Sequence, residues 1–189
     1  TDDISLLDID MLQTPHGQRE AVAPTVRTMR ESYLDKPVMP VINGEASYEM
    51  LMDKTPAEWP RAMFWLCMVN GAAGHTYGAN GIWQVNTPEQ PYGPSPHGRT
   101  WGDTPWQEAA QLPGSKHLGL AKGLLARYAW WKFEPHPEWV EPHWSKEEYV
   151  RPYAAGIARQ VRVVFIPPIW DSIKIVGIDV FRSDWVQPA

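Results

Sequence analysis

Short apolar runs alternate with longer amphipathic stretches along the first part of the chain. The runs at 4–12 and 38–43 are rich in branched and apolar residues, a composition typical of buried strands. Between them, apolar side chains recur at helical spacing and predict a helix with one buried face, formed by Val22, Val26, Met29 and Tyr33. A second helix is predicted through "RAMFWLCMV", because the preceding Thr55-Pro56-Ala57-Glu58 has the form of a capping box with proline at the first helical position.

The pattern changes twice in the remainder of the chain. "GAAGHTYGANGIW" is glycine-rich and strand-like, and 86–105 is so dense in proline and glycine that we expect a long loop. A short helix is predicted from Thr104 to Leu112, and a longer one from about Ser115 to Tyr128. The segments 161–168 and 173–181 are β-rich, and no helical pattern follows them.

The order of the predicted elements favours parallel βα units with a β appendage. Three such units are too few to close a (β/α)8 barrel, and no Gly-x-Gly-x-x-Gly fingerprint indicates a dinucleotide-binding sheet. An open sheet of this size would also expose a strand edge on each side. We therefore expect the chain to form part of a larger barrel.

Composition narrows the classes of function. The chain has 189 residues, 43% of them hydrophobic and 12% aromatic, which is enough material for a packed core. Its formal net charge is -5, and Lys and Arg do not cluster in a basic stripe. Nucleic-acid binding is therefore not expected. The single cysteine, Cys67, excludes an intrachain disulfide and a cysteine-built zinc site.

The candidate chemistry lies directly after the predicted strands, where barrel enzymes carry their active sites. Three clusters satisfy this rule: Gln13, Thr14 and His16; Asn43, Glu45, Tyr48 and Glu49; and His75, Tyr77, Asn80 and Trp83. The clusters combine one good candidate carboxylate with amides, imidazoles and aromatic rings, and they carry little positive charge. This set of side chains is typical of a carbohydrate-binding site.

Glycoside hydrolysis generally requires two carboxyl groups, and the sequence offers one good candidate. Glu45 suits the role, while Asp8 and Asp10 lie inside the first predicted strand and Glu49 is a weak substitute. A structural role is an alternative for each of these residues. Glu45 would then be a solvated turn residue, and His16 or His75 would be a hydrogen-bonded structural histidine.

Longer motifs carry a resemblance to a known family. "PVINGEASYE", "RAMFWLCMVNGAAGHTYGANGIWQ" and "PYAAGIARQVRVVFIPP" resemble the DUF4038 family, the apiosidase-like glycoside hydrolases, and "DIDMLQTPHGQRE" is similar to that family's sixth barrel strand and following loop. The resemblance covers residues from about 6 to about 168. It implies an α/β fold: strands 6–8 of a (β/α)8 TIM barrel over 1–145, followed by the start of a β-sandwich domain over 146–189.

The resemblance also implies roles. Glu45, at the end of strand seven, is expected to be the nucleophile of a retaining glycosidase, with the acid/base on an earlier strand outside this sequence. No metal or other cofactor is expected. The residues expected to bind the substrate are Gln13, His16, Asn43, Tyr48, His75, Tyr77, Asn80 and Trp83.

The expected partner is the N-terminal half of the same barrel, as a separate or cleaved chain, besides a plant-type glycoside or polysaccharide side chain as substrate. The alternative is a non-catalytic carbohydrate-binding or scaffold subunit that completes a barrel with a partner chain. Neither nucleic acid nor a membrane is expected as a partner. A secreted or periplasmic bacterial location is slightly preferred over a cytoplasmic one.

Overall fold

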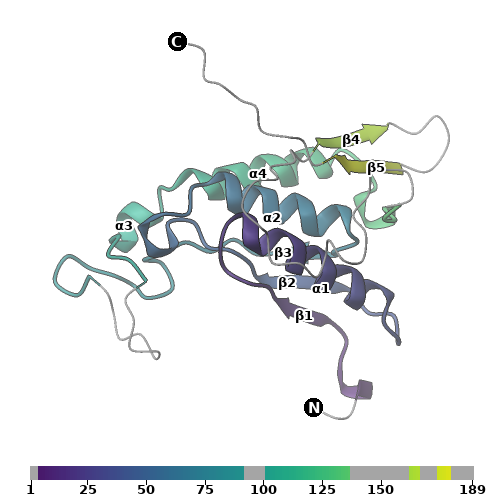
Figure 1. Cartoon of the computed structure of the whole chain (residues 1–189), viewed down its shortest axis with the longest axis horizontal. Helices are drawn as coiled ribbons and strands as arrows, with labels where there is room; N and C mark the ends of the chain where they lie inside the picture. Colours follow the sequence, from purple (N-terminus) through teal and green to yellow (C-terminus); the bar gives the residue numbers. More distant parts are fainter. Residues whose placement is uncertain (1–3, 92–100, 137–161, 167–173, 180–189) are drawn as a thin grey trace.

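A three-stranded parallel sheet organises the first part of the molecule. The computed structural model describes residues 4–91, 101–136, 162–166 and 174–179 (Figure 1). Its sheet has the order β1-β2-β3, and both pairings are parallel. The strands are β1 (Asp10–Gln13), β2 (Val41–Glu45) and β3 (Gly74–His75). Sequential parallel strands joined through helices confirm the predicted βα organisation.

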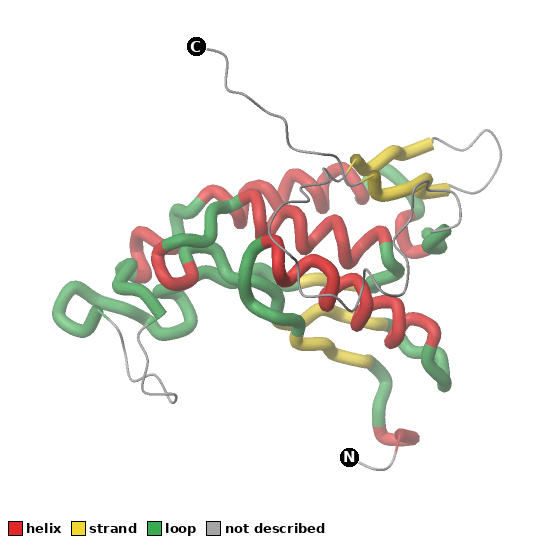
Figure 2. Tube along the Cα trace, viewed as in Figure 1, coloured by secondary structure: helices red, strands yellow, loops and turns green. Residues whose placement is uncertain are grey.

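Three long helices cover one face of this sheet, as Figures 1 and 2 show. They are α1 (Val22–Leu34), α2 (Glu58–Val69) and α4 (Pro113–Leu125). Their inner faces meet the sheet in a buried cluster that includes Met29, Val41, Phe64, Cys67 and Leu118. The opposite face of the sheet is open in the described part of the chain, where Met11 of β1 is 68% exposed.

The helix faces agree with the periodicity of the sequence. Val22, Val26 and Met29 are buried on α1, and Tyr33 is partly buried. On α4, Leu118, Ala121 and Leu125 are buried. An apolar side chain every three or four residues thus predicted which helix surface packs on the sheet.

The strand boundaries differ from those predicted. The first strand was predicted from residue 4 but begins at Asp10, and Ile4–Leu6 forms the 3-10 helix η1 instead. Asp10 pairs with Val41, the first residue of β2, so β2 offers no partner to earlier residues. The second strand runs to Glu45, whereas its predicted end was residue 43. Pairing with a neighbour sets where a strand starts and stops, and composition does not encode it.

The capping box predicted at Thr55 is wrong, and so is the one that Thr104-Pro105-Trp106-Gln107 suggests by the same pattern. Helix α2 has Ala57 at its N-cap with no side-chain hydrogen bond, and the Thr55 hydroxyl donates to the Leu51 carbonyl instead. The helix predicted from Thr104 is the short α3 (Trp106–Ala109), and it too lacks a side-chain cap. In both places the backbone follows tertiary contacts of the loops, which outweigh a cap's contribution of about 1 kcal/mol.

Shorter elements complete the described chain. The 3-10 helices η2 (Arg19–Ala21), η3 (Leu51–Asp53) and η4 (Trp130–Lys132) lie in the connections. Strands β4 (Arg162–Ile166) and β5 (Lys174–Asp179) pair antiparallel, so both predicted C-terminal strands are present. The predicted domain boundary near residue 145 lies outside the described residues. No helix of the described residues is long and apolar enough to cross a membrane.

A buried and an exposed leucine provide a test of the packing. Leu66 of α2 is 2% exposed, whereas Leu120 of α4 is 66% exposed. We expect Leu66→Ala to lower the free energy of unfolding by about 2–5 kcal/mol, because it leaves a cavity. The matched Leu120→Ala should change it by less than about 0.5 kcal/mol. Urea unfolding of the intact protein measures both values, and equal losses would contradict this assignment of the core.

Candidate active site

Glu45 lies at the C-terminal end of the central strand, where three parallel strands end together. The register between β1 and β2 shifts between Leu12 and Gln13, so that Gln13 pairs with Glu45. Beyond the strand, the Thr14 backbone N–H donates to the Glu45 carbonyl at 2.8 Å. The contacts with Gln13 and Thr14 fix the backbone of Glu45 at the end of β2. Its side chain remains 33% exposed.

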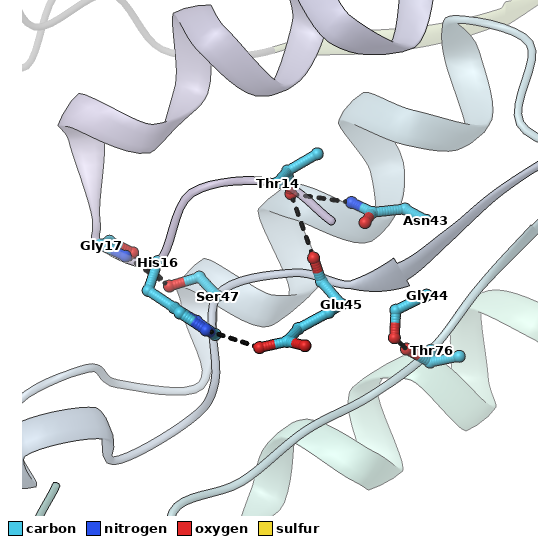
Figure 3. Close-up of polar contacts among 8 residues, drawn as sticks. All are labelled: Thr14, His16, Gly17, Asn43, Gly44, Glu45, Ser47 and Thr76. Atoms are coloured by element: carbon cyan, nitrogen blue, oxygen red, sulfur yellow. Dashed lines mark hydrogen bonds and ion pairs between the residues drawn. The ribbon is translucent and has the colours of Figure 1, made fainter. Parts of the chain in front are cut away.

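His16 is the direct partner of the Glu45 carboxylate (Figure 3). The imidazole Nε2 lies 2.9 Å from Glu45 Oε1, and the His16 side chain is 26% exposed. Residues 29 positions apart in the sequence are joined in this way. A hydrogen bond to one carboxylate oxygen fixes the plane of the carboxylate while leaving it open to solvent. The first two clusters thus meet at the ends of β1 and β2.

Tyr48 packs against this pair from the loop after β2. Its ring lies edge-on to the His16 ring, with 4.7 Å between ring centroids and an interplanar angle of 66°. Burial raises the pKa of the Tyr48 hydroxyl to about 12, and the negative charge of Glu45 and a hydrogen bond with it act in the same direction. Tyr48 is therefore a neutral hydroxyl beside the carboxylate at physiological pH.

Small polar residues hold the loop that carries His16. The Gly17 N–H donates to the Ser47 hydroxyl at 3.0 Å, and this hydroxyl in turn donates to the Gly17 carbonyl (Figure 3). The fully buried Asn43 amide is hydrogen-bonded to the Thr14 hydroxyl at 3.0 Å. Sequence analysis gave Ser47 no role and Asn43 a sugar-binding one. Their contacts instead attach the loop after β1 to β2, through Asn43, and to the loop after β2, through Ser47.

The third cluster is divided between the core and the surface. His75 directs its ring toward Phe64 of α2, with 5.6 Å between centroids, and thus lies on the helix side of the sheet. Tyr77 donates its hydroxyl to Glu49 Oε2 at 2.6 Å, and Asn80 is fully buried. Trp83 is 46% exposed, so among these four side chains it has the largest accessible surface.

Glu49 is a structural surprise, because a carboxylate expected on a loop is only 2% exposed. Its Oε2 accepts hydrogen bonds from Tyr77 and from the Gly114 N–H, the latter at 2.8 Å. This oxygen lies at the first turn of α4, where backbone N–H groups have no partner within the helix. Glu49 therefore faces away from Glu45 and does not supply a second carboxylate beside it.

Two further groups bear on cofactors and nucleophiles. In the part of the chain that the structure describes, no three His, Cys, Asp or Glu side chains gather as metal ligands would. Cys67 is fully buried, and its burial raises the pKa of the thiol to about 12, opposed by the nearby Asn43 amide. A buried neutral thiol of this kind is a core residue and a poor nucleophile.

Comparisons with known proteins agree with the parallel fold. The family model described as "Apiosidase-like, catalytic domain" matches residues 1–132. A solved "Glycoside hydrolase" is similar with a TM-score of 0.56 and 23% identity over 70% of this chain and 33% of its own. A glycoside hydrolase family 5 structure from Bacteroides vulgatus ATCC 8482 is similar with a TM-score of 0.57 and 22% identity, over 69% of this chain and 31% of its own.

The chain thus spans about a third of the length of these two solved structures. At such identities the likeness shows the fold alone. A search of curated proteins found no match.

His75 predicts a pH dependence of stability. Its ring nitrogens are shielded from solvent, and burial lowers the pKa of His75 to about 4. The unfolded chain would bind this proton near the ordinary pKa of about 6.5. Stability from His75 should therefore be complete above pH 6.5 and decrease as the pH falls from 6.5 toward 4. Urea unfolding across this range should show a smaller decrease in His75→Phe, which has no proton to bind. The same decrease in both proteins would contradict the assignment.

Proposed function

Because this chain belongs to the apiosidase-like family, we propose that it is part of a retaining glycoside hydrolase with Glu45 as its nucleophile. The observation that carries the proposal is the Glu45 carboxylate, one third exposed and held by His16 at the C-terminal end of the central parallel strand. Active sites of (β/α)8 barrels lie at this end of the strands. The same edge carries Gln13, which pairs with Glu45 in register.

In the proposed architecture, β1, β2 and β3 are strands six, seven and eight of a (β/α)8 barrel. Three features support it: strand order that follows the sequence, parallel pairing, and helices on one face only. The barrel part extends over 1–145, and the β4–β5 hairpin begins a β-sandwich domain over 146–189. The remaining strands would come from the N-terminal half of the same barrel, as a separate or cleaved chain.

The proposed reaction has two steps. A carboxylate oxygen of Glu45 attacks the anomeric carbon, and the bond from that carbon to the leaving oxygen breaks as an acid from the N-terminal half protonates this oxygen. Water, deprotonated by the same group, then attacks the anomeric carbon of the glycosyl-enzyme and releases Glu45. Both steps use two carboxyl groups and water, so we propose no cofactor.

Neighbouring side chains would orient the nucleophile and the sugar. His16 and Tyr48 fix the carboxylate, and the exposed Gln13 and Trp83 would contact the sugar, Trp83 by stacking on its apolar face. We revise the sugar-binding role of four residues. Asn43 and Asn80 have no accessible surface, the ring nitrogens of His75 are shielded, and the Tyr77 hydroxyl is bound to Glu49, so we give these groups a supporting role.

The substrate class follows from the family alone. We propose a plant-type glycoside or polysaccharide side chain, with apiose as the sugar suggested by the family's description. Pocket contacts set the choice of sugar within one fold, so the name of a family does not decide it. The alternative function is a non-catalytic, carbohydrate-binding or scaffold subunit. It is favoured by the position of Glu49, which is buried against α4 and so does not supply a second carboxylate beside Glu45.

Substitution of the nucleophile tests the reaction. We expect Glu45→Gln in the assembled enzyme to lower kcat by at least about a thousandfold, because the amide cannot form the glycosyl-enzyme. Turnover is measured with an aryl glycoside. Binding of this substrate, measured by calorimetry, should be largely kept. Glu31→Gln, an exposed carboxylate on α1, is the matched control and should leave turnover unchanged. Unchanged turnover in Glu45→Gln would remove Glu45 from catalysis.

The mass of the active species tests the composite barrel. We expect size-exclusion chromatography of native material to place the glycosidase activity in a species heavier than this chain alone. A whole barrel typically needs about 250 residues, so the partner should be of comparable size to this chain or larger. Activity of the isolated chain at its own mass would contradict the proposed partner and place the second carboxylate within this sequence. A heavier species that binds sugar but does not hydrolyse it would favour the scaffold alternative.

A further inference from the structure

One buried carboxylate joins three separate segments beside the candidate active site. Glu49, after β2, accepts the Tyr77 hydroxyl at 2.6 Å and the Gly114 N–H at 2.8 Å. Tyr77 follows β3, and Gly114 lies in the first turn of α4, 65 residues away from Glu49. At 2% exposure, these protein donors take the place of water around the carboxylate.

The backbone of Glu49 is fixed as firmly as its side chain. Its N–H donates to the Gly78 carbonyl at 3.0 Å, and its carbonyl accepts from the Asn80 N–H at 2.8 Å. Glu49 thereby forms a parallel bridge with Ala79. Successive side chains of such an extended segment point to opposite sides. Glu49 accordingly points toward α4, while its neighbour Tyr48 points toward His16 and Glu45.

Two glycines provide the space for this arrangement. A Cβ on Gly114 would lie 2.2 Å from Glu49 Oε2, and a Cβ on Gly78 would lie 2.1 Å from Cδ1 of Tyr48. Neither distance is possible for a real side chain in this geometry. The backbones of α4 and of the loop after β3 therefore approach Glu49 and Tyr48 as closely as only glycine allows.

We propose that Glu49 is a positioning residue for the glycosidase: its attachment to α4 and to the loop after β3 holds Tyr48 against Glu45 and His16. The inference rests on the proposed function, since it concerns the geometry of that nucleophile. It assigns Glu49 a role different from the acid/base of the reaction. Glu49 acts through Tyr48 and does not touch the substrate.

A carboxylate suits this position better than an amide. Both donors converge on one oxygen, and the partial positive charge of the helix N-terminus favours a negative group there. Glu49→Gln keeps the size of the side chain but weakens both hydrogen bonds by removing the charge. The segment that carries Tyr48 should then move relative to Glu45. An error of about 1 Å in a catalytic group is enough to lower turnover by about a hundredfold.

A double-mutant cycle in the intact, assembled enzyme tests the proposal. We expect Glu49→Gln to lower kcat by about 10- to 100-fold while KM changes by less than about threefold. In a Tyr48→Phe background, where the hydroxyl to be positioned is missing, the same substitution should lower kcat by less than about threefold. The exposed Glu31→Gln is again the control and should have no effect in either background.

A role in folding alone would give a different result. Glu49→Gln would then lower the amount of folded enzyme equally in both backgrounds, and kcat per folded molecule would not change; this outcome overturns the proposal. Tyr77→Phe removes one of the two donors to Glu49 and keeps the ring. It should show the same dependence on Tyr48 at a smaller size, and it keeps the proposal testable should Glu49→Gln not fold.

A second readout does not depend on activity. In protein labelled with carbon-13 at the tyrosine ring, the Tyr48 resonance, assigned by its loss in Tyr48→Phe, reports ionisation of this hydroxyl. We expect its pKa to move from about 12 in the wild type toward 10 in Glu49→Gln, as Tyr48 becomes less buried and moves away from the charge of Glu45. An unchanged Tyr48 titration overturns the positioning role. Failure of Glu45→Gln to lower turnover would instead overturn the proposed function while this titration still decides the role of Glu49.

Discussion

The parallel pairing of β1 with β2 is the constraint on which the candidate site depends. It places Gln13 beside Glu45 and brings the Thr14 N–H to the Glu45 carbonyl. From that point the chain needs only two further residues to carry the His16 imidazole to the carboxylate. Because side chains alternate along a strand, a shift of one residue in this register would turn the neighbouring side chains to the opposite face of the sheet. The register thus determines both the helix-facing core and the exposed pair.

Two glutamates four residues apart illustrate how environment separates roles. Glu45 is partly exposed and has an imidazole as its partner, whereas Glu49 is buried and has a hydroxyl and a helix N–H as partners. A buried carboxylate that already accepts hydrogen bonds from two protein donors is a poor candidate for exchanging bonds with a substrate. A group held on one oxygen and open to solvent is a good one. The difference in surroundings, which the spacing of the two residues does not reveal, supports the proposal that Glu45 is the reactive carboxylate.

Parts of this arrangement could be predicted from the sequence because they depend on local periodicity. The apolar faces of α1 and α4 follow from side chains three and four residues apart, and the strand-end rule selected His16, Glu45 and Tyr48 together. Strand limits could not be predicted in the same way, since β1 starts only where β2 offers a partner. The capping motifs failed because Thr55 found another acceptor at Leu51.

The role of Glu49 could not be predicted because its partners come from distant segments. Nothing near "EASYE" indicates that the first turn of α4 will reach it, 65 residues later. His75 failed as a predicted pocket residue for a related reason: β3 is only two residues long, and its pairing with β2 turns the ring to the helix side. A strand's two faces are decided by register, which one sequence does not encode.

The uneven burial of the sheet links the fold to the proposed chemistry. Parallel sheets are normally covered on both faces, yet only one face of this sheet packs against helices in the described residues. On the other face Met11 is 68% exposed and its side chain lies over Gly44, the residue before Glu45. An exposed apolar side chain on the uncovered face of a parallel sheet is typical of a surface that further strands would cover in a closed barrel. The open face therefore supports the proposal that further strands complete a barrel around it, with Glu45 at the rim where that interior meets solvent.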